Sequence, residues 1–284
     1  MANTISDRTY REGYYSTSLQ AILERALVAE RITEVDNTDR KVIDNPYGSR
    51  PVAEVQAISG EYVTDDFTTT DDALTVVEEV IVSEHIKDFE AVLTQFDLFA
   101  NRVKEMSFAV AEKIDRYVLN NLCEDATESY TTPLGGFTDP VNTHEILANL
   151  VSKVTGYSDM YKGLYLVIES TEIPGIFENQ MASGFSFADA ALNNGFVRSM
   201  AGVEIFVTRT GTFADETLGT KTYTNSGHRV FGVKKVATYA SPRGVKFEEK
   251  SVSGKTGKEV VAWGYIGFKL WATKASLTVD ITLS

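Results

Sequence analysis

The amino-acid sequence predicts an α+β fold, and three observations lead to this class. Residues 84–124 contain no proline or glycine and have apolar residues at helical spacing. An acidic, threonine-rich stretch at 60–76 separates two runs of strand-forming residues, and the chain from 236 to 284 is rich in β-branched and aromatic residues. With 284 residues, 43% of them hydrophobic and 24% charged, the chain has globular composition and is long enough for one large domain or two smaller ones.

The N-terminal region begins with one clear helical pattern. Residues 17–32, TSLQAILERALVAERI, are predicted to form an amphipathic helix, and Thr17 with Gln20 matches a capping box at its start. Five apolar side chains lie on one face of this helix: Leu19, Ile22, Leu23, Ala26 and Leu27. Residues 35–51 contain Asn, Asp, Gly and two prolines, so we expect an irregular connector there.

A long β-hairpin is predicted next. Its strands are VAEVQAI (52–58) and LTVVEEVIV (74–82), and they are joined through GEYVTDDFTTTDDALTV (60–76). An isolated two-stranded ribbon is at best marginally stable in water. The hairpin therefore needs a surface outside itself to pack against.

A long helix is predicted over residues 84–124, with Ser83 as its N-cap. At 1.5 Å per residue such a helix is about 55–60 Å long. A helix of this length usually acts as a beam on which other layers pack. Its apolar positions recur at three- and four-residue steps: Ile86, Phe89, Leu93, Phe96, Phe99, Val103, Met106, Val110, Ile114, Tyr117 and Leu122.

Helices and strands alternate from residue 133 to about residue 232, and strands dominate the remainder. We expect helices at 142–155, 173–181 and 187–195, strands at 163–170, 202–209 and 228–233, a loop at 210–227, and tail strands at 236–242, 244–251, 258–271 and 277–283.

Charge is unevenly distributed along a chain whose formal net charge is −13. Residues 61–90 carry ten acids and one base, whereas residues 234–258 carry seven bases and two acids. The two segments are either separate solvated surfaces or complementary patches that meet, including between copies of the chain. Complementary patches set register and partner choice.

Neither a metal site nor a cofactor site is predicted. Cys123 is the only cysteine, and His85, His144 and His228 are far apart with no second ligand at a suitable spacing. The sequence also has no run of about 18 apolar residues, so no membrane span is expected.

No catalytic residues are predicted either. The fragment SGKTG at 253–257 lacks the preceding glycine of a phosphate-binding loop, because Glu249 occupies that position, and we interpret it as a hairpin turn. The acidic pairs at 65–66, 71–72 and 78–79 cannot form shared sites, since adjacent residues of a strand point to opposite faces. The chain is therefore not expected to be an enzyme.

This order of parts resembles the major capsid proteins of tailed phages, which have the Hong Kong 97 capsid fold. The stretches that carry the resemblance are NPYGSRPVAEVQAISG, TTTDDALTV, SGFSFADAALNNGFV and SGHRVFGVKKVATYASPRGVKFEEKSVSGKTGKEVVAWGYIGFKLW. The resemblance implies an N-terminal arm at 1–50, an extended hairpin (E-loop) at 51–83, a peripheral domain with the spine helix at 84–132 and 234–284, and an α/β axial domain at 133–233.

The resemblance also implies self-assembly into pentamers and hexamers, with the hairpin lying on a neighbouring subunit. The expected contacts on the hairpin are Tyr62, Asp65, Asp66, Phe67, Asp71 and Asp72. The expected basic partners are Arg243, Lys246, Lys250, Lys255 and Lys258. Trp263 and Trp271 are further candidate interface aromatics, with a core position as the alternative for each.

Further expectations concern the particle. No lysine lies between Lys41 and Lys87, so the hairpin lysine of an isopeptide cross-link is absent, and the first helix lies too near Met1 to leave room for a removable scaffold domain. The expected setting is a virion capsid assembled in the host bacterial cytoplasm. Its partners would be a portal protein at one vertex, separate scaffolding and decoration proteins, and double-stranded DNA bound without sequence specificity.

Two other functions fit parts of the same sequence. An encapsulin-type compartment shares the fold but encloses cargo protein instead of DNA. A soluble α/β enzyme built around residues 140–235 is the alternative from another class, and the absence of a catalytic constellation argues against it.

Overall fold

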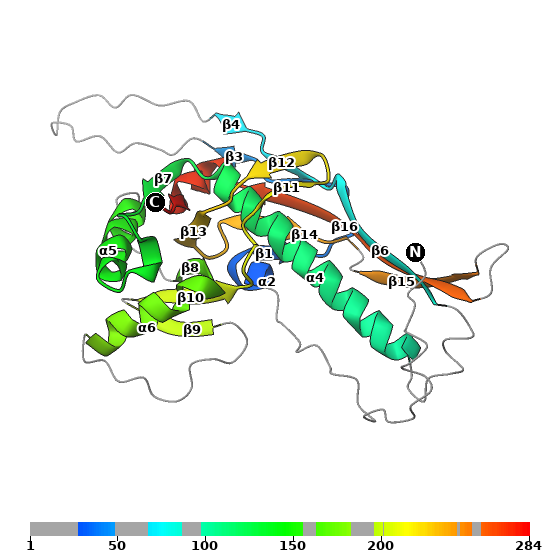
Figure 1. Cartoon of the computed structure of the whole chain (residues 1–284). Helices are drawn as coiled ribbons and strands as arrows, with labels where there is room; N and C mark the ends of the chain where they lie inside the picture. Colours follow the sequence, from blue (N-terminus) through cyan, green and yellow to red (C-terminus); the bar gives the residue numbers. More distant parts are fainter. Residues whose placement is uncertain are drawn as a thin grey trace, which may run out of the picture.

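The computed structural model describes residues 28–48, 68–86, 98–155, 163–182, 196–200, 202–242, 245–251 and 257–284. Two sheets and a long helix make up the body, and a thin β-ribbon projects from one end of it (Figure 1). One continuous hydrophobic core joins both sheets to the long helix.

Helix α4 (Leu98–Asp125) passes along both sheets. Residues 117–123 are all buried, because this end of the helix is enclosed on every side. The predicted start of the helix was wrong: residues 84–86 belong to strand β6 (Glu78–Ile86), and residues 87–97 lie outside the described residues. These three residues fit the helical spacing of apolar side chains, but they form a strand because β6 pairs over nine residues with a strand of the C-terminal region.

The first sheet is organised around the thirteen-residue strand β16 (Lys258–Leu270). One edge of β16 pairs with β15 (Lys246–Ser251) and then β14 (Ala237–Ala240), and the other edge pairs with β6. Strand β1 (Glu34–Asp36) adds in parallel to β14. The antiparallel join of β15 to β16 confirms the hairpin predicted around SGKTG, although residues 252–256 themselves lie outside the described residues.

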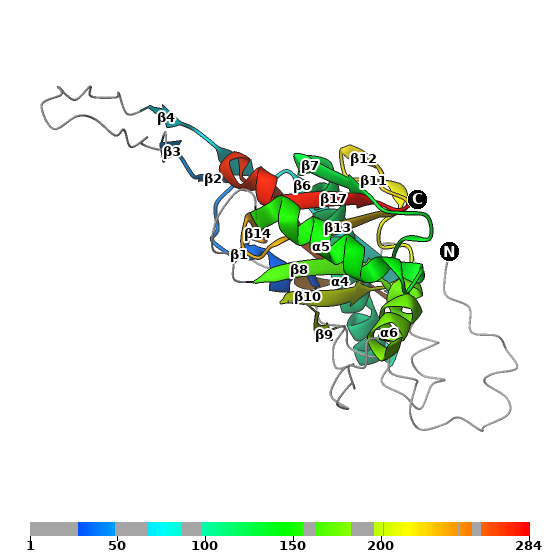
Figure 2. The ribbon, with the colours of Figure 1, turned by 90° about the vertical axis from the view of Figure 1, so that its left-hand side faces the viewer.

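The second sheet has six strands. Their order is β7 (Glu128–Thr131), β17 (Thr278–Thr282), β13 (His228–Val233), β8 (Leu164–Glu169), β10 (Val203–Thr208) and β9 (Phe196–Met200). All six residues of β8 are buried, as its uninterrupted apolar run predicts. Figure 2 shows α5 (Asn142–Thr155) on one face of this sheet and α4 on the other, with α6 (Ile173–Ala182) nearby.

Strand pairing crosses the predicted domain boundaries. We expected residues 84–132 and 234–284 to form a unit separate from 133–233, but β7 and β17 are strands of the six-stranded sheet. The buried side chains of Val279 and Ile281 on β17 bring the end of the tail into this sheet. Residues 128–131 and 278–282 therefore belong to the same sheet as strands of residues 133–233.

Several smaller elements complete the fold. Helix α2 (Val28–Ile32) covers the end of the helix predicted at 17–32, and residues 17–27 lie outside the described residues. Residues 210–227, predicted as a loop, contain the hairpin of β11 (Asp215–Leu218) and β12 (Lys221–Thr224). Short 3-10 helices lie at η1 (Gly136–Thr138), η2 (Ser170–Glu172) and η3 (Ala272–Leu277), whereas the helix predicted at 187–195 lies outside the described residues.

We predict that Leu119→Ala on α4 lowers the free energy of unfolding by about 2–5 kcal/mol, because it leaves a cavity where a side chain is completely buried. The measurement is urea unfolding of the unassembled chain. Leu134→Ala is the matched control, since Leu134 is 85% exposed and should change stability by less than about 0.5 kcal/mol. Equal losses in the two variants would contradict the burial of this part of α4.

Candidate assembly interface

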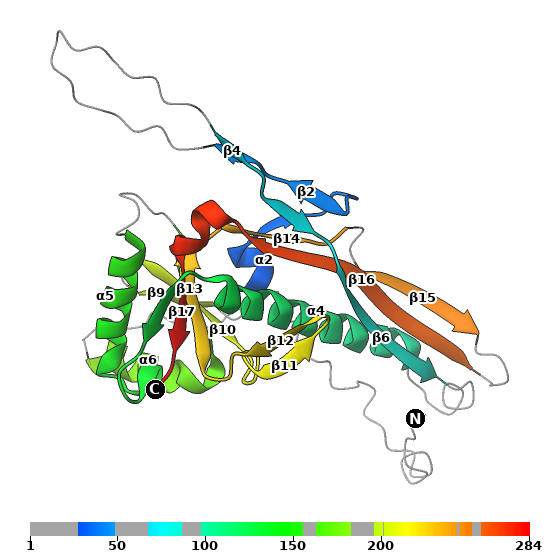
Figure 3. The same cartoon turned by 90° about the horizontal axis from the view of Figure 1, so that it is seen from above.

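The ribbon that projects from the body is built from two short ladders. Strand β2 (Val42–Asp44) pairs with β5 (Ala73–Thr75), and β3 (Tyr47–Gly48) pairs with β4 (Thr69–Thr70) (Figure 3). The ladder starts at Val42, inside the segment expected to be irregular. The predicted strand at 52–58 lies outside the described residues, as do Tyr62, Asp65, Asp66 and Phe67.

The base of the ribbon is anchored by apolar side chains. Leu74 and Val76 are buried with Ala240 and Trp271 in a small hydrophobic cluster. Gly267 permits this approach, because a Cβ there would lie 3.1 Å from atoms of both Leu74 and Val76. Trp271 donates a hydrogen bond to Thr238 Oγ1 (2.9 Å), so this candidate interface aromatic is a core residue of its own subunit.

Asp72 anchors the base of the ribbon through charge. Its carboxylate lies 3.0 Å from Lys269 Nζ and accepts a hydrogen bond from the Ala272 N–H (3.0 Å). Partial burial by itself raises the pKa of Asp72, but the Ala272 N–H and the Lys269 ammonium outweigh it and hold the pKa below its ordinary value. The neighbouring Asp71 is exposed, as expected for alternate faces of a strand.

Glu78, at the start of β6, makes a third attachment. Its carboxylate accepts hydrogen bonds from the Thr220 N–H (3.1 Å) and the Thr220 hydroxyl (2.6 Å) in the β11–β12 turn. Gly219 adopts φ 62°, and Glu78 occupies the space that a side chain at 219 would need. The β11–β12 hairpin is in turn held to α4, through Lys113 and Arg116 to Glu216 (3.0 and 3.3 Å) and Lys221 to Asp125 (3.2 Å).

These anchors were missed by sequence reasoning. Asp72 and Glu78 were interpreted as members of an acidic surface segment, whereas both bind groups about 140 to 200 positions away. The sequence does contain a pattern that could have identified them. Asp72, Leu74, Val76 and Glu78 are spaced two residues apart, and this spacing places all four on one face of an extended segment.

The basic segment forms part of an exposed sheet face on β6, β16 and β15. In register, Ile81 on β6, Trp263 on β16 and Lys246 on β15 lie side by side. Lys246 Nζ is 5.6 Å from the centre of the Trp263 ring, and Trp263 packs edge-on against Tyr265, with ring centres 5.4 Å apart. We call this surface the outer sheet face; its members are Val77, Ile81, Lys246, Lys250, Trp263 and Tyr265.

The outer sheet face has more exposed apolar surface than a solvated strand pair usually has. Val77, Ile81 and Tyr265 are 64%, 58% and 44% exposed. Lys250 lies at the margin and pairs with Glu248 (3.3 Å). Lys258 is in the β16 ladder, while Arg243 and Lys255 lie outside the described residues. Strand alternation also places Glu79, Glu248 and Glu259 on this face, beside Lys246 and Lys250. An apolar centre with a charged margin of both signs is a typical protein–protein interface composition.

A cluster of charged groups is buried at the end of the six-stranded sheet. Arg229 Nε donates to Glu172 (2.7 Å), and an Nη atom donates to Glu169 (3.2 Å). Glu169 also accepts the N–H groups of Gly211 and Phe213 (3.0 and 3.1 Å). Burial raises the pKa of Glu172, although the Arg229 guanidinium opposes the shift.

This cluster joins the end of β8, η2, β13 and the loop before β11. Every carboxylate in it is already bonded to a group of the protein and almost completely buried, so it has the features of a structural network and not those of a substrate site. Across the described ranges no group of three or more His, Cys, Asp or Glu side chains is placed to hold a metal ion. In the same residues, no helix is long and apolar enough to cross a membrane.

Comparisons with known proteins agree on the fold. No protein-family model and no curated protein matches the sequence. Among solved structures, the capsid of Cyanophage P-SCSP1u matches with a TM-score of 0.74 at 11% identity, covering 100% of this chain and 99% of the other. A chain of Mycobacterium phage Che8 matches with a TM-score of 0.73 at 15% identity, covering 94% and 95%.

A capsid chain of an empty gene transfer agent (GTA) particle matches with a TM-score of 0.68 at 13% identity, covering 99% of this chain and 100% of the other. The predicted likeness to tailed-phage capsid proteins is confirmed at the level of the fold. The chain therefore has the mixed helix-and-strand fold of these capsid proteins along its whole length.

We predict that Asp72→Asn lowers the unfolding midpoint at neutral pH, because it removes the ion pair with Lys269. A carboxyl whose folded pKa is depressed stabilises the protein above its ordinary pKa of 3.8, and this contribution is lost as the pH falls through the lower folded value. Thermal unfolding of the wild type and of Asp72→Asn across the acid range should show that the difference between their unfolding midpoints disappears at low pH. Asp71→Asn is the matched control. A difference in midpoint between the wild type and Asp72→Asn that is constant over the whole pH range would contradict the ion pair of Asp72 with Lys269.

Proposed function

We propose that this chain is the major capsid protein of a tailed bacteriophage and assembles with copies of itself into an icosahedral shell around double-stranded DNA. The observation that carries the proposal is the full-length likeness of the fold to phage and gene transfer agent capsid chains. The projecting ribbon supports it, because β3 and β4 are half-buried or exposed and gain little support from their own subunit.

The parts of the fold take the following roles in this proposal. The ribbon that begins at β2 is the extended hairpin, α4 is the spine helix of the peripheral domain, and the six-stranded sheet with α5 and α6 is the core of the axial domain. The segment before β2 is the N-terminal arm. The pairing of β7 and β17 with the six-stranded sheet would couple the peripheral and axial parts within one rigid subunit.

The hairpin of one subunit would lie on the outer sheet face of a neighbour. Its acids Asp65, Asp66 and Asp71 would meet Lys246 and Lys250 on this face, with Arg243 and Lys255 as further expected partners. Lys258 is left out, because strand alternation places it on the face opposite Trp263. Tyr62 and Phe67 would cover the exposed apolar centre around Ile81 and Trp263. Asp72 is left out of this contact, because its carboxylate is bound inside its own subunit.

The shell would be held by non-covalent contacts. No lysine lies between Lys41 and Lys87, so the hairpin carries no amine for an isopeptide bond. Scaffolding and decoration would come from separate proteins, and a portal would occupy one vertex. With a net charge of −13 the shell would hold DNA without sequence-specific contacts, in particles assembled in the host bacterial cytoplasm.

The expected behaviour of the purified chain is association into pentamers, hexamers or closed shells, measured by size-exclusion chromatography with negative-stain microscopy. Particles isolated from their source should contain double-stranded DNA and a portal. Cargo protein in place of DNA would identify an encapsulin-type compartment. A monomer under all conditions would contradict a shell protein.

The intersubunit contact is tested by charge reversal. Lys246→Glu with Lys250→Glu should abolish or strongly reduce assembly, because it sets acids of the outer sheet face against the acids of the neighbouring hairpin. Assembly should be restored when Asp65→Lys and Asp66→Lys are added. Lys274→Glu, at an exposed position on η3, is the control. Assembly that is unaffected by the first pair of changes would place the hairpin elsewhere.

A further inference from the structure

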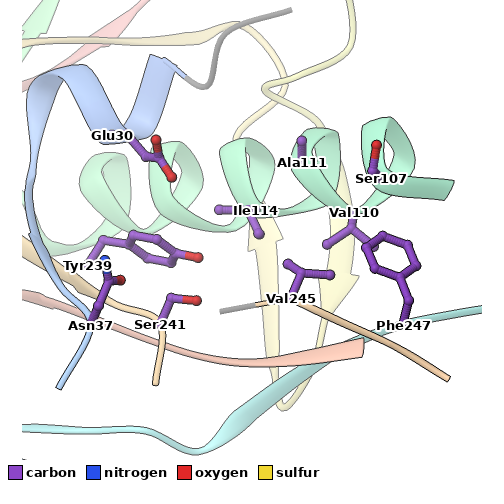
Figure 4. Close-up of a pocket in the computed structure, with 10 residues that line it drawn as sticks. All are labelled: Glu30, Asn37, Ser107, Val110, Ala111, Ile114, Tyr239, Ser241, Val245 and Phe247. Carbon is purple, nitrogen blue, oxygen red and sulfur yellow. The ribbon is translucent and has the colours of Figure 1, made fainter. Parts of the chain in front are cut away.

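An apolar groove lies between α4 and the strands β14 and β15, beside α2 (Figure 4). Its volume is about 400 Å³. Val110, Ala111 and Ile114 of α4 form one side, and Val245 and Phe247 form the other, on the face of the sheet opposite the outer sheet face. Polar side chains gather at the α2 end, where Glu30, Asn37 and Ser241 line the groove.

The groove is an incompletely covered part of the core. Phe247 and Val245 are 43% and 36% exposed, whereas Val110 and Ile114 opposite them are almost completely buried. An exposed phenyl ring beside a buried helix face marks a site where another apolar segment packs.

The chain itself supplies a candidate at one end of the groove. The described residues begin at Val28, in the helix whose Glu30 lines the groove. The N–H groups of Val28 and Ala29 donate to the Asp115 carboxylate (3.2 and 2.9 Å), which caps the N-terminus of α2 next to Ile114. A helix that precedes this point is therefore separate from α2 and joined to it by a bend. Twenty-seven residues precede this point, and residues 17–27 among them carry the apolar stripe predicted from the sequence.

The dimensions of this stripe agree with those of the groove. From Leu19 to Leu27 a helix rises about 12 Å, and from Ser107 to Ile114 the wall on α4 rises about 10.5 Å. Because Leu27 is bonded directly to Val28, the stripe reaches the groove without a linker and at high effective concentration.

We propose that residues 17–27 occupy this groove of the same subunit as an amphipathic helix. Leu27 lies near Ile114, and Leu19 lies toward Phe247 and Ser107. The segment covers Phe247 and Val245 and completes the core on this side of α4. The inference concerns the single subunit, so it stands or falls independently of shell assembly.

Cross-linking tests which segment fills the groove. The full-length chain would carry Leu23→Cys and Phe247→Cys and would be treated with a short thiol-specific cross-linker while unassembled. Cys123 is a suitable silent background, because it is buried and burial raises the pKa of its thiol well above the ordinary value. The expected product has monomer mass and a cross-linked peptide that joins positions 23 and 247.

Leu23→Cys with Leu134→Cys is the control pair, since Leu134 is exposed at a distant site and should give no intrachain product. A product of dimer mass from the first pair would mean that the segment of a second copy fills the groove, which overturns the proposal. The same holds if no cross-link forms.

A double-mutant cycle gives a second measurement. Leu23→Ala should lower the urea midpoint of unfolding in the wild-type background and change it much less in a Phe247→Ala background, because the two side chains share one contact. Equal shifts in both backgrounds would show that the segment packs elsewhere.

Discussion

The packing of α4 against both sheets is the contact on which the rest of the structure depends. Its C-terminal half is enclosed by the six-stranded sheet on one side and by β16 and β6 on the other. The helix can hold two sheets together only because consecutive residues, and not just one stripe, are buried between 117 and 123. Both the six-stranded sheet and the base of the projecting ribbon are therefore positioned relative to one rigid element.

The projecting ribbon illustrates how a marginally stable element is held in place. Every second residue from Asp72 to Glu78 points into the body and makes a different kind of contact: an ion pair, apolar burial, and hydrogen bonds to a turn. The residues between them point outward. This extended segment, from the residue before β5 to the start of β6, thus has one set of side chains that supports the subunit and another that is exposed at the surface.

Charge serves two separate purposes in this chain. Arg229, Glu169 and Glu172 are buried and bonded to one another and to the backbone, which specifies how the strands and turns meet at one end of the six-stranded sheet. Charges at the surface, such as those of Lys246 and Lys250, remain near solvent and are suited to partner choice. Net charge alone does not separate these purposes, since acids of both kinds contribute to it.

The sequence by itself determined the elements whose signals are local. The helix at 142–155, the buried strand at 164–169, and the strands at 203–208, 228–233 and 258–270 follow from periodicity and apolar runs. Tertiary structure alone decided that residues 84–86 join a strand and that β7 and β17 belong to the six-stranded sheet. It also decided that Asp72 and Trp271 act inside the subunit, because their partners lie far away in the chain. The spacing of apolar residues in the sequence indicates which side chains are buried. It does not indicate which distant segment covers them, because that depends on the tertiary structure.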